Sequence, residues 1–384
     1  MTTSILTDPN EMASVEQRWH RLHEISTGTI FQTPAWTLTW CRTFQDCFAM
    51  RILTVMDGEE LLGVMPCFLE PSTYGPIRLH RLRMVGEHSI FGGYEPLVHP
   101  GRREEVLSEF VALLNHELRS RKTDIVDFHF LDPQGPVGRT LNSQLRGRGL
   151  HTQFTPLSTS HLTVDLPVSF DTYLKALGDR TRKNLKNQER VLIRQGAQCE
   201  ILGGSRAGAS FEEFALLHRT RWASEGQRGH LETRPRFLEF CRAIVALIPA
   251  ATRFYFMKEN DTAVAGLMVF ALHGRVHVYL SGRDPAHPWS RLSPGRVLIG
   301  MCIRDAIGQG ARVVDFQGGD EAYKLHLGGK EKGYARLIAA GSLRGKFFLS
   351  AFAVARRLEG GPGSVSRLAP FIRRLKQLRR INPG

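Results

Sequence analysis

The chain has 384 residues, 42% of them hydrophobic and 23% charged, which is an ordinary globular composition whose length favours two domains. Its net charge of +14 is unevenly spread. Residues 344–384 hold ten Lys and Arg against one acid, so +9 lies in this tail and only +5 in the rest of the chain. A nucleic-acid-binding groove running through the fold is therefore not indicated.

The spacing of cysteine and histidine residues argues against a metal-binding or disulfide-rich protein. The six cysteines contain no Cys-x-x-Cys pair, so we expect neither a zinc site nor a disulfide framework, and a reducing cytoplasm follows. The histidines show no metal-ligand spacing, and we expect no metal. No stretch resembles a signal peptide or approaches the roughly 20 apolar residues of a membrane-spanning helix.

The first half predicts a β-hairpin, a third strand, a helix and a fourth strand. The hairpin is indicated by the turn pair Asp57-Gly58, and the helix by apolar residues at helical spacing. The expected elements are strands at 51–56, 61–69 and 77–85, a helix at 102–121, a strand at 124–130, and a short helix with loops over 131–156.

The second half predicts the same order after three helices. Asn260-Asp261 and His273-Gly274 are the turn signals here. The expected elements are helices at 170–195, 210–224 and 234–247, strands at 251–258, 263–272 and 276–282, a helix at 295–307 and a strand at 312–318.

Two short matches indicate that the halves are related. Gly63-Val64-Met65 parallels Gly266-Leu267-Met268, and Val126-Asp127-Phe128 parallels Val314-Asp315-Phe316, in the same order of elements. We therefore predict a duplicated α/β (mixed α+β) domain. The expected divisions are an N-terminal segment 1–30, domains at 31–160 and 161–343, and a basic amphipathic tail at 344–384.

A candidate anion site lies where the strand 276–282 leads into the helix from Gly295. Pro294 suits a first helical turn, whose free N–H groups and dipole attract anions. Arg291, Ser293 and Arg296 lie beside it. A plain strand–loop–helix crossover explains the same pattern without a ligand.

Polar residues also follow the strand 312–318. Two glycines, then Asp320, Tyr323 and Lys324, stand at the carboxyl end of a buried strand, where α/β folds tend to bind ligands. A solvated connection is the alternative explanation.

Two further stretches have weaker signals. The helix containing Arg182 carries five basic residues against Glu189 over 180–190, and either a solvated face or an anionic ligand accounts for it. Tyr94 and Glu95 follow two glycines in the first half, where a structural turn is the alternative. No Ser or Cys has the surroundings of a nucleophile elbow, so a covalent triad is not expected.

Together these stretches resemble the GNAT-type acyltransferases called CelD/BcsL, a family named for cellulose biosynthesis and related to the FemAB peptidyltransferases. The matching pieces are FQTPAWTLTWCRTF (31–44), LRMVGEHSIFGGYEPLV (82–98), the basic helix 180–195, HRTRWASEGQRG (218–229), and YLSGRD…SPG…DFQGGDEAYK (279–324). The last is the most specific. The Q/R-x-x-G-x-G/A loop that is usual in GNAT proteins is absent, and Ser293-Pro294-Gly295-Arg296 stands in its place.

The resemblance implies two tandem GNAT-like domains and transfer of an acyl group to an amine. It places the pyrophosphate of acyl-CoA at 276–300, with Ser281, Gly282, Arg283, Arg291, Ser293, Gly295 and Arg296 as cofactor-binding residues. It assigns Tyr323 as the donor of a proton to the leaving thiolate. It also places Lys324 near the bound ligands, and Tyr94, Arg182 and Trp222 are the other expected substrate contacts.

Attack of an amine on a thioester needs a hydrogen-bond donor to the developing oxyanion and a proton donor for the leaving thiolate. It also needs a base that takes a proton from the amine. Backbone N–H groups at 281–283 are the expected oxyanion contact, and Asp320 or Glu95 is the expected base. Positioning alone accounts for much of the catalysis in such transfers, so a strong base is not required.

We expect an N-acyltransferase that uses acetyl-CoA or a longer acyl-CoA and acts on an amino sugar or similar amine in envelope polysaccharide synthesis. FemAB-like transfer from aminoacyl-tRNA and a non-catalytic scaffold of a synthase complex are the alternatives; nucleic acid is otherwise not an expected partner. In the tail, apolar residues at helical spacing alternate with basic ones over 346–380, as in a helix on an anionic membrane. We therefore expect a cytoplasmic protein with peripheral contact to the inner membrane, although the same helix could pack on the fold.

Overall fold

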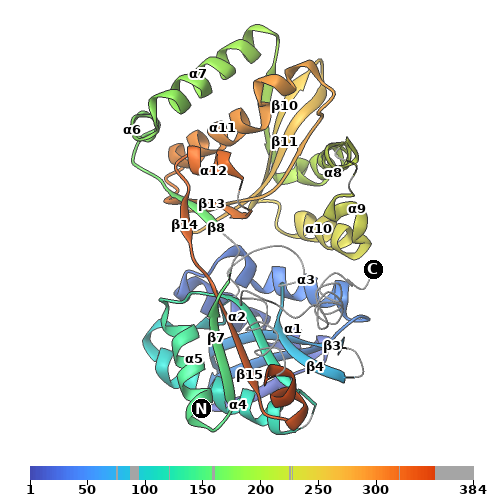
Figure 1. Cartoon of the computed structure of the whole chain (residues 1–384), viewed down its shortest axis with the longest axis vertical. Helices are drawn as coiled ribbons and strands as arrows, with labels where there is room; N and C mark the ends of the chain where they lie inside the picture. The colour runs from blue at the N-terminus through green and yellow to red at the C-terminus, as the bar shows by residue number, and fades with distance from the viewer. Residues whose placement is uncertain are drawn as a thin grey trace, which may run out of the picture.

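A computed structural model describes residues 1–74, 77–86, 95–120, 122–157, 161–224, 226, 228–319 and 321–350. The chain forms two β-sheets, each with helices on its faces. The two halves lie end to end along the long axis of the molecule (Figure 1). Among the described residues, no helix is both long and apolar enough to cross a bilayer.

The first sheet has the strand order β1-β2-β3-β4-β6-β15-β7, with β5 paired to β3. Neighbouring strands are antiparallel, except that β4 and β6 are parallel. Its strands are β1 (Thr2–Leu6), β2 (Ala49–Asp57), β3 (Glu60–Tyr74), β4 (Ile77–Met84), β5 (Leu97–Val98), β6 (Ile125–Leu131), β7 (His151–Pro156) and β15 (Ala335–Ala340). Its helices are α1 (Pro9–Ser14), α2 (Glu16–Ser26), α3 (Pro34–Phe44), α4 (Arg103–Arg119) and α5 (Pro136–Gly147).

The second sheet has the order β9-β10-β11-β12-β13-β8-β14, and only β12 and β13 are parallel. Its strands are β8 (His161–Asp165), β9 (Gln198–Gly203), β10 (Thr252–Glu259), β11 (Thr262–Leu272), β12 (Arg275–Arg283), β13 (Val313–Gly318) and β14 (Lys330–Lys332). Its helices are α6 (Phe170–Ala176), α7 (Asp179–Arg194), α8 (Ala207–Ser224), α9 (His230–Thr233), α10 (Pro235–Leu247), α11 (Pro294–Gly308) and α12 (Ala322–His326). Figure 1 shows α8 and α11 on opposite sides of the strands.

The two sheets have the same plan, and each contains one strand from elsewhere in the chain. β1, β2, β3, β4 and β6 correspond in order to β9, β10, β11, β12 and β13. The next position is taken by β15 in the first sheet and by β8 in the second. Each half therefore places a strand between two strands of the other, and Figure 1 shows the chain running from β14 in one sheet to β15 in the other.

Local sequence accounts for most of these elements. Gly58, Asn260, Asp261, His273 and Gly274 all have positive φ, which confirms the three predicted turns. The predicted helix 170–195 is two helices instead, because the chain is extended at Leu177 and Gly178. A glycine weakens a helix interior, and Asp179 favours a new helix start because its charge complements the dipole.

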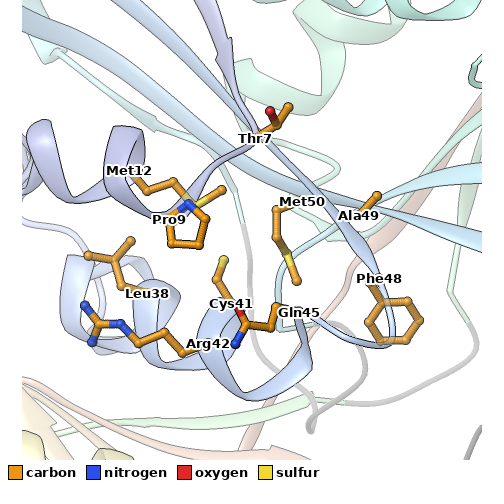
Figure 2. A pocket seen from close by; sticks show the side chains of 10 residues that line it. All are labelled: Thr7, Pro9, Met12, Leu38, Cys41, Arg42, Gln45, Phe48, Ala49 and Met50. Carbon is orange, nitrogen blue, oxygen red and sulfur yellow. The ribbon is translucent and has the colours of Figure 1, made fainter.

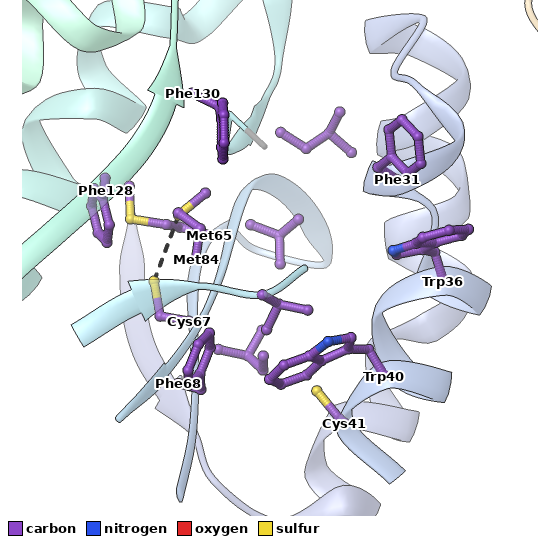
Figure 3. Close-up of a cluster of buried hydrophobic side chains, with 14 of the residues drawn as sticks. Phe31, Trp36, Trp40, Cys41, Met65, Cys67, Phe68, Met84, Phe128 and Phe130 are labelled. Atoms are coloured by element: carbon purple, nitrogen blue, oxygen red, sulfur yellow. Dashed lines mark hydrogen bonds between the residues drawn. The ribbon is translucent and has the colours of Figure 1, made fainter. Parts of the chain in front are cut away.

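Aromatic side chains of α3 join the two halves. Trp40 lies against Phe68 of β3, with ring centroids 4.9 Å apart (Figure 3). Trp36 makes edge contacts with Phe240 of α10 and Tyr279 of β12, at 4.9 and 5.6 Å. Both tryptophans are fully buried, so α3 is covered on one side by the first sheet and on the other by the second half.

The sheets do not follow the divisions expected at residues 30 and 343. β1 forms the edge of the first sheet and Trp19 of α2 is fully buried, so residues 1–30 are not a separate segment. β15 lies in the first sheet because it pairs with both β6 and β7, the second of which was expected to be loop. The tail begins as a helix at 343–350 whose Leu349 packs on the first sheet. The rest of the expected amphipathic helix lies outside the described residues.

Candidate functional site

The second sheet opens between β12 and β13. These parallel strands pair only at Arg275–His277 with Val313–Asp315, although β12 continues to Arg283 and β13 to Gly318. A bulge adds to the divergence, because Tyr279 is the extra residue where Met268 and Val269 pair with Leu280 and Val278. Bulges increase local twist and often lie beside functional sites. The carboxyl ends of these two buried strands are therefore not paired with each other, and this divergence is the opening between β12 and β13.

Helix α8 closes one side of the end of β12. A Cβ atom on Gly282 would lie 2.8 Å from the backbone N of His218, so only glycine permits this close packing. The His218 ring donates from Nδ1 to the carbonyl of Ser281 at 2.9 Å. Burial, followed by the nearby Arg221, lowers the pKa of His218 to about 4, although the bond to Ser281 opposes the shift. His218 is therefore neutral at physiological pH.

Arg221, one turn further along α8, holds the Ser281 side chain. Its Nη1 donates to Ser281 Oγ at 2.7 Å, and its guanidinium lies 5.1 Å from the ring of Trp222. Arg221 also acts electrostatically on Tyr323 of α12. The structure thus places Ser281 and Trp222 against one guanidinium at the end of β12.

Two residues of α12 lie at the end of β13. Burial, with a contribution from Glu321, raises the pKa of Tyr323 to about 12, so its hydroxyl keeps its proton at neutral pH. Lys324 is buried, and its Nζ donates to the carbonyl of Gly318 at 2.8 Å and pairs with Glu321 at 2.8 Å. The ammonium group is therefore engaged with the loop after β13, and it positions the chain there.

Buried polar groups lie where β12 and β13 begin to part. Gln317 Nε2 donates to His277 Nδ1 at 2.9 Å, and Asp315 lies 3.6 Å from the same nitrogen. Within the described part of the chain, His277 Nε2 and Gln317 Oε1 have no hydrogen-bond partner. Gln317 also has φ +59, which is uncommon for a residue with a side chain. Such buried and strained polar groups are more typical of a functional site than of a packed core.

The charge states of these groups follow from burial. Burial, followed by the charge of Arg275, lowers the pKa of His277 to about 3. Burial raises the pKa of Asp315, although the Gln317 N–H opposes the shift. Burial and then Lys324 lower the pKa of His161 to about 4. His277 is therefore a neutral imidazole beside one carboxyl group where the strands part, and His161 of β8 is a second neutral imidazole, on the other side of β13.

The expected anion site lies at the start of α11. Ser293 is its N-cap residue with φ +52, and a Cβ on Gly295 would meet only open space. Arg291 is exposed, while Arg296 donates from Nη2 to Gln188 of α7 at 2.7 Å. Arg182 of the same helix pairs with Asp179 at 2.5 Å. Arg283 is the last residue of β12.

Glu95 lies in the first half, two residues before β5. Its carboxylate accepts the backbone N–H of Asp132 at 2.9 Å, and it lines a cavity of about 10 Å³ with Trp19 and Phe31, which has room for one water molecule at most. Burial raises the pKa of Glu95, although the Asp132 N–H opposes the shift. The other expected base, Asp320, and the expected contact Tyr94 lie outside the described residues.

A larger cavity lies away from all the expected site residues. Side chains of α1, α3 and β2 surround about 140 Å³ in the first half (Figure 2). Cys41 lines it, and burial raises the pKa of this thiol to about 12, so it stays protonated and is a poor nucleophile. The cavity is too small for a coenzyme, and nothing around it resembles transfer chemistry.

Comparison with known proteins identifies the fold. Residues 179–325 match the profile of the acetyltransferase (GNAT) domain, and no curated protein matches the chain. Among solved structures, FemX has a TM-score of 0.61 at 12% identity, with 91% of this chain and 99% of that chain covered. L-PGS from Bacillus licheniformis has a TM-score of 0.54 at 12% identity, with 90% and 96% covered. The fold is that of two GNAT-like units in tandem.

The GNAT match covers α7 to α12, and therefore the opening between β12 and β13. Sequence reasoning missed three residues there: His218, Arg221 and His277. The first two lie in the stretch 218–229 that carried the resemblance, where only Trp222 was singled out. His277 gave no signal, because only the register of β12 on β13 brings it beside Asp315.

Proposed function

We propose that the protein is an N-acyltransferase whose reaction takes place at the opening between β12 and β13. The observation that carries this proposal is the divergence of two parallel strands after three residue pairs, with a bulge at Tyr279. Beyond that point the edge of β12 no longer pairs with β13. An extended donor that contains amide groups, such as the pantetheine arm of acyl-CoA, can pair with such an edge as a further strand would.

The reaction forms a C–N bond to the acceptor amine and breaks the C–S bond of the thioester. Arg221 and Ser281 form a polar pair at the end of β12, near the developing oxyanion. Tyr323 holds its proton at neutral pH and can donate it to the leaving thiolate. Asp320 or Glu95 remains the proposed base; the acceptor amine must lose its proton to one of them or to water.

The start of α11 is the proposed site for the donor phosphates. Arg291 and Arg296 lie beside a helix start with open space at Gly295. Helix N-termini bind phosphate because their free N–H groups point toward it. Gly282, Arg283 and Ser293 complete the proposed donor site, and Lys324, Tyr94, Arg182 and Trp222 remain the proposed acceptor contacts.

The pathway is proposed from the resemblance. The resemblance of the sequence to the CelD/BcsL group favours an amino sugar or similar amine in envelope polysaccharide synthesis as acceptor. The amphipathic tail would then hold the enzyme at the inner leaflet of the membrane from the cytoplasmic side, through residues 346–380.

Transfer from aminoacyl-tRNA is the second candidate, and one observation favours it. The face of α7 opposite its buried Leu185 and Leu192 exposes Arg180, Lys183, Lys186, Arg190 and Arg194. A row of five cations along one helix could contact a phosphate backbone. Against it, the folded part of the chain carries a modest charge of +5.

Calorimetric titration of the full chain with acetyl-CoA, longer acyl-CoAs and charged tRNA separates the two candidates. We expect an acyl-CoA to bind, and Arg291→Gln with Arg296→Gln to weaken binding at least tenfold. Arg304→Gln, further along the same helix and paired with Glu189, is the matched control and should bind as the parent does. Binding of charged tRNA with no response to any acyl-CoA would overturn the proposal, and binding without turnover would favour the scaffold.

A further inference from the structure

A second polar cluster joins the two halves far from the opening. His23 and Glu24 lie in the last turn of α2, and His273 lies in the turn between β11 and β12. One ligand atom from each lies within 4.8 Å of the other two. Over the residues that the structure describes, no other group of three His, Cys, Asp or Glu meets this condition.

The hydrogen bonds of the two rings decide which nitrogens face the cluster. His23 Nε2 lies 2.9 Å from the carbonyl oxygen of Thr29, and His273 Nδ1 lies 3.1 Å from that of Gly28. A carbonyl oxygen only accepts hydrogen bonds, so both nitrogens must be donors. In a neutral ring the other nitrogen then has a lone pair. Metal-binding histidines commonly have their second nitrogen held in this way by a backbone carbonyl.

The two remaining nitrogens face one carboxylate. His23 Nδ1 is 4.0 Å and His273 Nε2 is 3.3 Å from the Glu24 oxygens, and the rings stack with centroids 5.1 Å apart. Two lone pairs and an anion repel each other unless a cation or a proton lies between them. The carboxyl end of α2 adds negative potential to the same place, which also favours a cation.

We propose that His23, Glu24 and His273 bind a divalent transition-metal ion, with Zn²⁺ the best match to this donor set. Zinc bonds to His nitrogen and carboxylate oxygen at about 2.0–2.2 Å, so tetrahedral ligands lie roughly 3.3 Å apart. The His273–Glu24 distance already has this value. The Glu24 side chain is 70% exposed, so it can rotate to shorten its distance to His23 Nδ1. The two ring nitrogens lie within 4.8 Å of each other, and a small ring movement would complete the site. Water fills the fourth position.

The proposed ion would act as a clamp between the halves, because its ligands come from α2 of the first and the β11–β12 turn of the second. Its surroundings are rigid on one side: a Cβ on Gly28 would lie 2.7 Å from the His23 ring, so this loop closes directly over the ligand. On the other side the exposed Glu24 leaves a path from solvent. The metal is structural here and is independent of the transfer reaction.

Metal titration of the full-length chain tests this proposal. The protein is treated with a chelator, dialysed, and titrated calorimetrically with zinc chloride and then with cobalt(II), whose visible absorption reports four-coordinate binding. We expect one equivalent to bind and to raise the melting temperature. His273→Asn should weaken binding at least tenfold, since asparagine tolerates the positive φ of this turn, and Glu24→Gln should do the same.

His20→Asn, which changes an exposed histidine on the same helix, is the matched control and should bind zinc as the parent does. Absence of zinc and cobalt binding by the parent chain would overturn the proposal and leave an ordinary His273–Glu24 ion pair. Equal loss of affinity in His20→Asn and His273→Asn would also overturn it, because binding would then be unspecific.

Discussion

The two halves share a strand order but differ in what lies where their parallel strands part. In the first half, Asp127 follows the last pair of β4 with β6 and is bound by Arg336 at 2.6 and 2.7 Å. Arg81 is 3.4 Å from the same carboxylate. In the second half the corresponding Asp315 faces neutral His277, and His277 Nε2 and Gln317 Oε1 have no hydrogen-bond partner among the described residues. Between β4 and β6, ion pairs neutralise the buried carboxylate. Between β12 and β13, polar groups stay available for a ligand.

The pKa values show the same contrast. Burial alone would raise the pKa of Asp127, but Arg336 and Arg81 hold it well below its usual range. Burial raises the pKa of Asp315, and the Gln317 N–H and the charge of Arg275 offset this shift only in part. Asp127 therefore stabilises the fold at neutral pH, whereas ionised Asp315 costs stability. Strained and poorly compensated groups concentrate at functional sites, so the second opening is the better candidate for chemistry.

The largest expected effect is a loss of folding stability when Asp127 of the first half is replaced. Asp127→Asn leaves the half-buried Arg336 without its anion, although Arg81 keeps Glu70 at 2.9 Å, and should lower the free energy of unfolding by about 3 kcal/mol. Urea unfolding followed by circular dichroism measures it. Asp57→Asn, which removes an exposed carboxylate 3.3 Å from Arg102, should change stability by less than about 0.5 kcal/mol. A loss below about 1 kcal/mol for Asp127→Asn would show that the first opening is not held by this network.

The second effect is on activity and rests on the proposed function. Tyr323→Phe removes a proton donor while keeping the ring, so kcat should fall about 100-fold with the donor KM nearly unchanged. Steady-state kinetics with an acyl-CoA and an amine acceptor measure it. Tyr173→Phe removes a hydroxyl that donates to Leu327 in the same half, and its kcat should stay close to that of the parent. A raised KM with unchanged kcat would assign Tyr323 to binding instead.

The third effect is a pH dependence of stability. The folded-state pKa of His277 is depressed to about 3, so below pH 6.5 the unfolded chain takes up a proton that the folded chain refuses. Its contribution to stability is complete above pH 6.5 and is lost toward pH 3, by about 1.4 kcal/mol per pH unit. Urea unfolding at a series of pH values should show this slope reduced by about one proton in His277→Gln. His20→Gln should leave the slope unchanged.

The smallest expected effect is on folding stability when Asp315 of the second half is replaced. Asp315→Asn removes a carboxylate whose ionised form is disfavoured by burial, so the unfolding free energy at neutral pH should change by less than about 1 kcal/mol or increase. The asparagine oxygen can still accept the Gln317 N–H, which lies 2.8 Å from Asp315. The same urea assay measures it. A loss as large as that of Asp127→Asn would remove the distinction between the two openings.

Sequence reasoning recovered the elements that depend on local signals. The hairpins were predictable because Asn260-Asp261 and His273-Gly274 adopt positive φ readily, and α4 and α11 because their apolar residues recur at helical spacing. The order of elements in the two halves also indicated the duplication. No strand was predicted at 335–340, and the expected domain 161–343 included these residues, whereas β15 pairs with β6 and β7 of the first sheet.

The candidate site was predictable only where its residues are neighbours in sequence. Ser281, Gly282 and Tyr323 lie in the stretch that carried the resemblance, and they end β12 or lie on α12. Arg221 and His277 reach the same place through packing of α8 and the register of β13, which no spacing in the sequence encodes. The cluster of His23 with His273 is a further case, since it exists only after the two halves meet.

The exchange of β8 and β15 determines when each sheet can be completed during synthesis. β6 and β7 leave the ribosome early, but the strand that must lie between them follows much later: Arg336 and its partner Asp127 are 209 residues apart. Until then both strands expose unpaired edges, which are prone to wrong pairing. Such distant pairing also slows folding. The nascent first half is therefore prone to mispairing, and any fragment ending before residue 335 would lack the strand between β6 and β7, whose place a peptide with the sequence of β15 could take.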